Sequence, residues 1–322
     1  MTIRRRLILA SALACATFSA TAQGYPERPV RVVVPYAPGG STDLIARIIS
    51  EPLGRALGKP VVVDNKAGAG GMLGTQEMTR VPADGYTLGI GTVSTLVIFP
   101  AVHPRPGYTI EQILPITNIA TMPNIVAVRP GFPAKDLKEL LAVLKANPGK
   151  YAYATSGQGS INHMLGESFQ SGAGVELNHI PYRGSGPAMQ DVMAGQVDIL
   201  FDQLPSSKPY IDSGKLRLLG VIAPARLPDY PQIPTLQEVG IKGLSDQAWY
   251  GLIAPARLPP AVQTKLASAM KEVMAMPDVA ARLAKVGANP LGNSSAEYTT
   301  QIQQEVKRMK VLVQERHISL QD

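Results

Sequence analysis

The chain contains the stretch Arg31-Val-Val-Val-Pro-Tyr-Ala-Pro-Gly39-Gly40-Ser41-Thr42-Asp43, in which an apolar strand leads through a glycine-rich turn into a predicted helix. The same order of elements returns in Tyr151-Ala-Tyr-Ala-Thr155-Ser156-Gly157-Gln-Gly159-Ser160-Ile-Asn-His163. At such a junction the unpaired backbone N–H groups and the positive end of the helix dipole meet at one point. The sequence therefore predicts two loops, about 115 residues apart, that could hold one anion between them.

The first loop offers backbone N–H groups to a ligand. We expect Gly39, Gly40 and Ser41 to donate these groups. Asp43 satisfies the helix dipole itself and would repel a carboxylate placed close to it, so its expected role is to orient the loop. The alternative is an ordinary turn between a strand and a helix, in which the glycines allow unusual backbone angles and Ser41 caps the helix.

The second loop is richer in side-chain donors. Thr155, Ser156 and Ser160 carry hydroxyl groups, and the glycines between them expose the backbone. His163 follows one turn into the predicted helix, where it could donate a hydrogen bond to an anion; a structural role for this lone histidine is the alternative. Neither loop contains an obvious nucleophile with a base, which favours capture of a ligand over catalysis.

The N-terminus has the three parts of a secretory signal peptide. Arg4-Arg5-Arg6 precedes an apolar stretch of 12 residues at 7–18, and Ala20-Thr21-Ala22 forms a cleavage site of small residues. Spanning a bilayer takes about 20 residues, so an uncleaved anchor is the weaker alternative. We expect residues 1–22 to be removed, leaving 322 − 22 = 300 residues that begin at Gln23 and are exported to the periplasm.

Composition excludes several function classes for the mature chain. Its one cysteine, Cys15, lies inside the signal peptide, and Ala12 stands where a lipidation signal would have leucine, so we expect no lipid anchor. Residues 23–322 then contain no disulfide, thiolate metal site or cysteine nucleophile. The signal peptide holds three arginines and no acids, which leaves a charge of 28 − 24 = +4 and predicts no nucleic-acid partner.

Strand-like and helix-like patterns alternate along the chain, which predicts an α/β fold with largely parallel sheets. Strands are expected at 30–34, 60–64 and 86–91, and helices at 43–57 and 71–80. About 300 residues favour two domains. Two short apolar strands, at 124–128 and 249–254, predict the places where the chain crosses between them.

Familiar enzyme and metal motifs are missing from the sequence. It has no G-x-S-x-G, no H-E-x-x-H and no Walker A pattern, and its near match to G-x-G-x-x-G, at 68–73, ends in leucine. Its four histidines show no metal-ligand spacing. We therefore expect no catalytic residues, no bound metal and no cofactor.

The motifs resemble, in order and over nearly all of residues 23–322, the Bug-type substrate-binding receptors of the tripartite tricarboxylate transporter family. The motifs that carry this resemblance are Pro35-Tyr-Ala-Pro-Gly-Gly-Ser-Thr-Asp43, Val63-Asp-Asn-Lys-Ala-Gly-Ala-Gly-Gly71, Ala83-Asp-Gly-Tyr-Thr-Leu88, Tyr153-Ala-Thr-Ser-Gly-Gln-Gly-Ser160 with His163, Ile180-Pro-Tyr-Arg-Gly-Ser-Gly-Pro-Ala188, Gly195-Gln-Val-Asp198, Phe201-Asp202-Gln-Leu-Pro205 and Trp249-Tyr-Gly-Leu-Ile-Ala-Pro255.

The resemblance implies a type II periplasmic-binding-protein (Venus-flytrap) fold, with two α/β lobes joined by two crossing hinge strands. The first lobe would comprise residues 23–124 and 251–322, and the second residues 125–250. The lobes would close over a small organic carboxylate, held by N–H groups, hydroxyl groups and bridging waters. The implied binding residues are Gly39, Gly40, Ser41, Thr155, Ser156, Gly159, Ser160, His163 and Asp202.

Two departures from the family pattern bear on the ligand. Thr95-Leu-Val-Ile-Phe-Pro100 replaces a usually polar run, and Gln203 stands where asparagine is usual. If Leu96 and Phe99 face the cleft, the ligand would have an apolar or aromatic body carrying its carboxylate.

The implied partner is the membrane permease of a tripartite transporter, served by a monomeric receptor. One alternative is a receptor for another transporter class. A hydrolase using Ser160 and His163, three residues apart on one helical face, is a second. A third is a signalling protein that docks onto a sensor.

Overall fold

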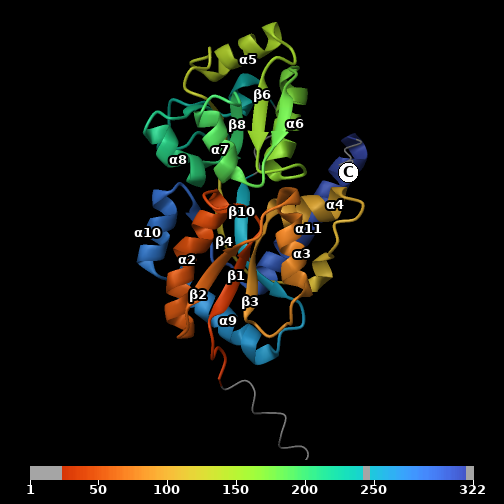
Figure 1. The fold of residues 1–322 in the computed structure, drawn as a ribbon, viewed down its shortest axis with the longest axis vertical. Coiled ribbons are helices and arrows are strands. Elements are labelled where there is room, and N and C mark those ends of the chain that lie inside the picture. Colours follow the sequence, from red (N-terminus) through yellow and green to blue (C-terminus); the bar gives the residue numbers. More distant parts are fainter. Residues whose placement is uncertain (1–23, 242–246, 317–322) are drawn as a thin grey trace, which may run out of the picture.

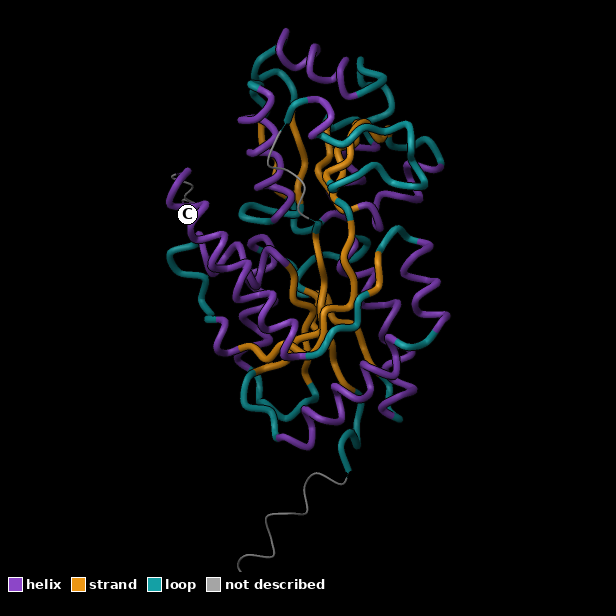
Figure 2. The backbone as a smooth tube through the Cα atoms, turned by 180° about the vertical axis from the view of Figure 1, so that it is seen from behind, coloured by secondary structure: helices purple, strands orange, loops and turns teal. Residues whose placement is uncertain are grey.

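The computed structural model describes residues 24–241 and 247–316, which form two lobes, each built around its own sheet. Figure 1 shows one lobe above the other, and Figure 2 shows from behind that helices surround the strands of both. The predicted signal peptide, with Cys15, lies outside the described residues. Within the described ranges no helix is both long enough and apolar enough to cross a membrane.

The first lobe contains a six-stranded sheet with the order β11-β4-β10-β3-β1-β2. Its strands are β1 (Val30–Val34), β2 (Val61–Asn65), β3 (Thr87–Thr92), β4 (Ile113–Met122), β10 (Ala248–Pro255) and β11 (Asn289–Pro290). Its helices are α2 (Ser41–Leu57), α3 (Met72–Arg80), α4 (Phe99–Val102), α9 (Pro260–Met274), α10 (Pro277–Lys285) and α11 (Ser295–Arg316).

The second lobe contains a five-stranded sheet with the order β7-β6-β8-β5-β9. Its strands are β5 (Asn124–Val128), β6 (Ala152–Thr155), β7 (Asn178–Pro181), β8 (Ile199–Gln203) and β9 (Arg217–Ile222). Its helices are α5 (Leu137–Ala146), α6 (Ile161–Ala173), α7 (Ser185–Met193) and α8 (Leu204–Asp212).

The predicted alternation of strands and helices is confirmed, but both sheets are mixed rather than largely parallel. β1 is parallel to β2 and β3, and β6 is parallel to β7 and β8. β10 is antiparallel to β3 and β4, and β5 is antiparallel to β8 and β9. The antiparallel pairs arise because β5 and β10 each enter a lobe from the other lobe, without a crossover helix to turn the chain round.

The chain passes from the first sheet to the second between Met122 and Asn124, and it is back in the first sheet at Ala248. Figure 1 shows β10 at the waist between the lobes. The sequence placed Asn124 in the first lobe, but it already pairs in the second sheet. It placed Tyr250 in the second lobe, but this residue already pairs in the first sheet. The division of the whole chain into two domains stays a prediction.

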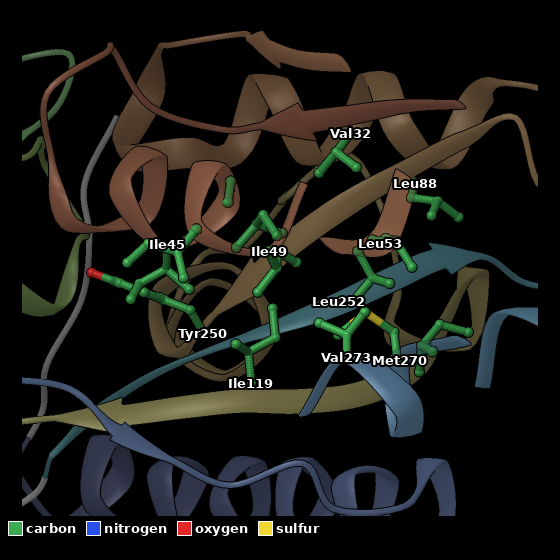
Figure 3. Close-up of a cluster of buried hydrophobic side chains, with 14 of the residues drawn as sticks. Val32, Ile45, Ile49, Leu53, Leu88, Ile119, Tyr250, Leu252, Met270 and Val273 are labelled. Carbon is green, nitrogen blue, oxygen red and sulfur yellow. The ribbon is translucent and has the colours of Figure 1, made fainter. Parts of the chain in front are cut away.

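Apolar side chains cover both faces of each sheet, as the short, nearly continuous apolar strands require. Along β1, Val32 points into a cluster with α2 and α9, and its neighbour Val33 points into a cluster on the opposite face. Figure 3 shows the first cluster, with Tyr250 among its side chains. A second pair of clusters encloses the five-stranded sheet, with Phe201 on one face and Leu200 on the other.

One buried hydroxyl group makes a test of this packing. Tyr298 of α11 is fully buried, its ring packs edge-on against Trp249, and its hydroxyl has no hydrogen-bond partner in the described part of the chain. Because burying an unpaired hydroxyl costs about 1–3 kcal/mol, we expect Tyr298→Phe to raise the free energy of unfolding by about 1 kcal/mol. Urea denaturation measures this change.

The matched control is Tyr108→Phe. The buried Tyr108 hydroxyl donates to the carbonyl oxygen of Thr95 at 2.5 Å, so its removal leaves that acceptor unpaired and should destabilise the protein by about 1 kcal/mol. A clear loss of stability in Tyr298→Phe would show that its hydroxyl is hydrogen-bonded after all.

Candidate functional site

A small cavity lies between the two lobes. Its volume is about 10 Å³, which is room for about one water molecule. The residues that line it are Tyr36, Gly40, Ser41, Thr42, Thr92, Val93, Ser94, Ser156, Ile161, Asn162, Ser185, Gln203, Ala248 and Tyr250. This lining combines hydroxyl, amide and backbone groups and contains no charged side chain among the described residues.

Four helices begin around this cavity. α2 of the first lobe starts at Ser41, and α6, α7 and α8 of the second lobe start at Ile161, Ser185 and Leu204. Figure 1 shows α2 rising toward α7 and α8. The first N–H groups of a helix have no acceptor within it, and the helix dipole adds positive potential there. The site therefore favours an anion without using a lysine or arginine.

The first predicted loop reaches the cavity through two of its three candidate residues. Gly40 and Ser41 line it, whereas the N–H group of Gly39 donates to Oδ2 of Asp43 at 3.1 Å. The same carboxylate accepts from Nε of Arg47 at 3.0 Å. Asp43 thus orients the loop, as the sequence predicted, and in this conformation it occupies the N–H group of Gly39.

The second predicted loop reaches the cavity through Ser156. No described residue hydrogen-bonds its hydroxyl, so this group can donate into the cavity. Ser160 instead caps α6: its hydroxyl donates to the carbonyl oxygen of Gly157 at 2.6 Å and accepts from the N–H group of His163 at 3.3 Å. Ser160 is fully buried, so it supports the loop from behind.

Thr155, Gly159 and His163 also lie behind the loop. Nδ1 of His163 accepts from the N–H group of Gly159 at 3.2 Å, which leaves the imidazole proton on Nε2. The Thr155 hydroxyl is 2.7 Å from Nε2 of His179. Because His163 bonds Gly159 rather than taking a proton from the Ser160 hydroxyl, the geometry of a serine nucleophile with its base is absent from this pair.

His163 belongs to a stack of rings that the sequence did not predict. His179 lies 4.1 Å from it and Tyr153 lies 4.9 Å from His179, measured between ring centroids. The Tyr153 hydroxyl donates to Oε1 of Glu167 at 2.5 Å. Burial lowers the pKa of His163, although nearby Glu167 opposes this shift. Burial, and then the neighbouring His163, lowers the pKa of His179 to about 4.

Asp202 is fully buried and organises hydroxyl groups around the cavity. It accepts from Ser185 at 2.6 Å and from Ser206 and Ser207 at 2.7 Å each. Burial raises the pKa of Asp202, and these serine hydroxyls oppose the rise. Asp202 does not line the cavity, so its effect on a ligand would pass through the serines that it holds.

Direct contacts join the two lobes across the site. The Ser41 hydroxyl lies 2.7 Å from that of Ser206 and accepts from the Ser206 N–H group at 3.0 Å. The Ala37 N–H group donates to the carbonyl oxygen of Arg183 at 3.0 Å. Ser94 accepts from the N–H group of Ile161 at 2.9 Å. The lobes are therefore closed on one another, and glycines permit the close approach.

Several lining residues were not among the candidates from the sequence. Thr92 ends β3 and Ser94 begins the helical turn at Ser94–Ile98, so a strand again leads directly into a helix start, the signal that identified the other two loops. Tyr36 lay within a quoted motif, between the expected strand at 30–34 and the glycines, but was assigned no role in binding. Asn162, Gln203 and Tyr250 come from three separate elements, and no local pattern marks them.

The expectation of an apolar wall fails for Leu96. Its side chain is fully buried in the core of the first lobe, in the cluster that contains Val33 and Met78. Phe99 is also buried and does not line the cavity. Leu96 faces inward because the turn at Ser94–Ile98 packs its apolar side against the sheet, whereas the Phe99 ring lies beside Gly70 and packs edge-on against His103. The apolar character of Leu96 therefore reflects the core and carries no information about the ligand.

No group of three or more metal-ligating side chains that could hold an ion occurs in the described ranges.

Comparison with known proteins points to a family of binding receptors, as the two-lobed geometry of the site does. The model of the tripartite tricarboxylate transporter family receptor matches residues 45–318. Protein BugT of Bordetella pertussis is 34% identical over 297 residues, which cover 92% of this chain and 91% of BugT.

Two solved structures with ligands are similar over most of their length. R. palustris Rpa4515 with adipate is 31% identical, with a TM-score of 0.87, and covers 92% of this chain and 99% of its own. MatC from Rhodopseudomonas palustris with bound malate is 32% identical, with a TM-score of 0.85, and covers 90% of this chain and 100% of its own.

The two-lobed fold and these matches place the chain in the class of periplasmic binding proteins. The chain belongs to the tripartite tricarboxylate transporter receptor family, a family of binding proteins rather than enzymes. The relationship inferred from the sequence motifs is confirmed.

The stacked histidines predict how stability depends on pH. In the folded protein both pKa values lie below the value of about 6.5 expected for the unfolded chain. The unfolded chain therefore takes up more protons as the pH falls through 6.5, so stability should decrease from pH 7.5 to pH 5.5. Because both rings are partly exposed, we expect a loss on the order of 1–2 kcal/mol, measured by urea denaturation.

His179→Phe keeps an aromatic ring in the stack but cannot take up a proton, so the pH dependence should become flatter. His103→Gln removes a histidine outside the stack and serves as the control. An equally steep pH dependence in His179→Phe and in the unchanged protein would contradict this account.

Proposed function

We propose that this receptor binds a small organic carboxylate in the cavity between its lobes and delivers it to the permease of a tripartite tricarboxylate transporter. Family membership supports the transport role. Adipate and malate, the ligands of two similar structures, are both dicarboxylates, so a dicarboxylate is the first class to test. Export to the periplasm through the signal peptide at residues 1–22 and a monomeric state complete the proposal.

One observation carries the proposal: donors from both lobes surround a cavity with no charged side chain in its described lining. The first N–H groups of α2 belong to Ser41 and Thr42, which line it from the first lobe. From the second lobe, Ser156 supplies its hydroxyl group and Ser185 supplies the first N–H group of α7, because the Ser185 hydroxyl already donates to Asp202. A carboxylate would be held by these donors, by the helix dipoles and by bridging waters.

The roles of the other candidate residues follow from their contacts. Gly40, Ser41 and Ser156 would touch the ligand or its waters, because they line the cavity. Thr155, Gly159, Ser160 and His163 would hold the second loop in shape. Asp202 would fix the serine hydroxyls, and Gly39 would reach a ligand only after Asp43 releases its N–H group.

Binding requires the lobes to move apart, because a cavity of about 10 Å³ cannot admit a dicarboxylate. The two passages between the sheets, around Pro123 and before Ala248, are where such a hinge motion would occur. A ligand that replaces the contacts between Ser41 and Ser206 would then bind both lobes and favour renewed closure.

A thermal-shift screen tests the proposal. The purified protein is unfolded, refolded to remove bound molecules, and heated with C4 to C6 dicarboxylates or with aromatic carboxylates. A ligand at a hundred times its dissociation constant stabilises the folded state by about 2.7 kcal/mol, which gives a saturable rise in melting temperature. We expect the dicarboxylates to produce it. No shift with any carboxylate would overturn the proposed ligand class.

Ser156→Ala should weaken binding of the active dicarboxylate about tenfold, because it removes a hydrogen bond to a charged group. Ser213→Ala, at an exposed serine of the second lobe that bonds only its own helix, is the matched control and should bind normally. Isothermal titration calorimetry measures both. Equal affinities of Ser156→Ala and Ser213→Ala for the dicarboxylate would show that Ser156 does not bind it.

A further inference from the structure

A buried amide links both passages between the lobes. Nε2 of Gln203, at the end of β8, donates to Oδ1 of Asn124 at 2.9 Å and to Oδ1 of Asn162 at 2.7 Å. Its Oε1 accepts from the Tyr250 hydroxyl at 3.0 Å. Asn124 begins β5, the first strand after the passage into the second lobe, and Tyr250 lies near the start of β10, the first strand after the return.

All four side chains are almost fully buried; Tyr250, the most exposed, keeps 4% of its surface. Asn124, Asn162 and Gln203 belong to the second lobe, whereas the Tyr250 ring packs in the core of the first lobe, among the side chains of Figure 3. The hydrogen bond from Tyr250 to Gln203 is thus the one member of this network that crosses between the lobes.

The direction of each hydrogen bond in this network is determined. Nδ2 of Asn162 donates to the carbonyl oxygen of Phe201 at 2.8 Å, and a carbonyl can only accept. Oδ1 of Asn162 therefore faces Gln203 and must accept from its Nε2. That places Oε1 of Gln203 toward Tyr250, whose hydroxyl must donate.

This polarity limits what Gln203 can offer a ligand. Both of its N–H groups are used by the two asparagines, so the amide has no donor left for a carboxylate. Although Gln203 lines the cavity, only its oxygen remains, and this atom repels an anion. Its contribution to binding must come from the position of the lobes.

We propose that Gln203 is a positioning residue: it ties the second lobe to Tyr250 of the first lobe and shifts the balance toward closed lobes, without itself binding the carboxylate. The proposal rests on the proposed function, capture by lobe closure. The bond joins protein groups alone, so it favours closure whether or not a ligand is bound.

The lobe balance can be measured by single-molecule FRET with no carboxylate added. In a Cys15→Ser background, dyes are attached through Val62→Cys on β2 and Lys138→Cys on α5, two exposed positions in different lobes. Tyr250→Phe removes the crossing hydrogen bond and keeps the ring. We expect the ratio of closed to open molecules to fall about fivefold, as for the loss of one hydrogen bond.

Gln203→Met keeps the length of the side chain and removes the same crossing bond, together with the two bonds that Gln203 makes inside the second lobe. Because those two bonds do not join the lobes, the double variant should close as often as Tyr250→Phe alone. Tyr108→Phe is the control: it removes an equally buried tyrosine hydrogen bond that lies wholly within the first lobe, so its ratio should not change. If Gln203→Met does not fold, the comparison of Tyr250→Phe with Tyr108→Phe decides.

An unchanged ratio in Tyr250→Phe, additive effects in the double variant, or an unmodified protein with no measurable closed population would each overturn the proposal. None of these results depends on whether a carboxylate binds, so a failure here is distinct from a failure of the thermal-shift screen. If both proposals hold, Tyr250→Phe should also weaken dicarboxylate binding, by no more than its effect on the lobe ratio.

Discussion

The arrangement of the site depends on one buried carboxylate, that of Asp202. It sits where three helices of the second lobe begin and accepts hydrogen bonds from Ser185, Ser206 and Ser207. Three serine hydroxyls satisfy its oxygens and the helix N-termini around it add positive potential, which explains how this carboxyl group tolerates full burial without a basic partner among the described residues. The Ser206 hydroxyl in turn contacts that of Ser41 in the first lobe, so the same carboxyl group orders hydroxyl groups in both lobes.

The same hydrogen-bond donors could bind a ligand or join the two lobes. Backbone N–H groups and hydroxyls that could bind an anion instead join the lobes in this conformation, as in the pairs Ser41–Ser206 and Ser94–Ile161. A ligand therefore exchanges one set of hydrogen bonds for another, and only the difference contributes to affinity. A site without a fixed cation can also adapt to carboxylates of different length by rearranging water.

The sequence predicted the local features well and the distant ones poorly. The two junctions at Gly40 and Ser156 could be recognised because a strand, a small-residue loop and a helix start are adjacent along the chain. Whether a polar residue lines the cavity or supports it could not be predicted, because Ser156 and Ser160 differ only in the direction of their side chains. Gln203 and Tyr250 meet through the packing of two lobes, which no local pattern encodes. The sheets were expected to be parallel because the returning strands carry no sign of their direction.

The contact between the glycine-bearing loops has a consequence for engineering. A side chain added at Gly186 would press on the carbonyl oxygen of Pro38 in the other lobe, and one added at Gly70 would press on that of Gln158. Such a residue would hold the two lobes apart by a distance that depends on the size of its side chain. Replacing Gly186 with residues of increasing size would therefore give a set of receptors that differ in the width of the cleft between their lobes. The size of the solute that each receptor admits would then depend on the residue chosen.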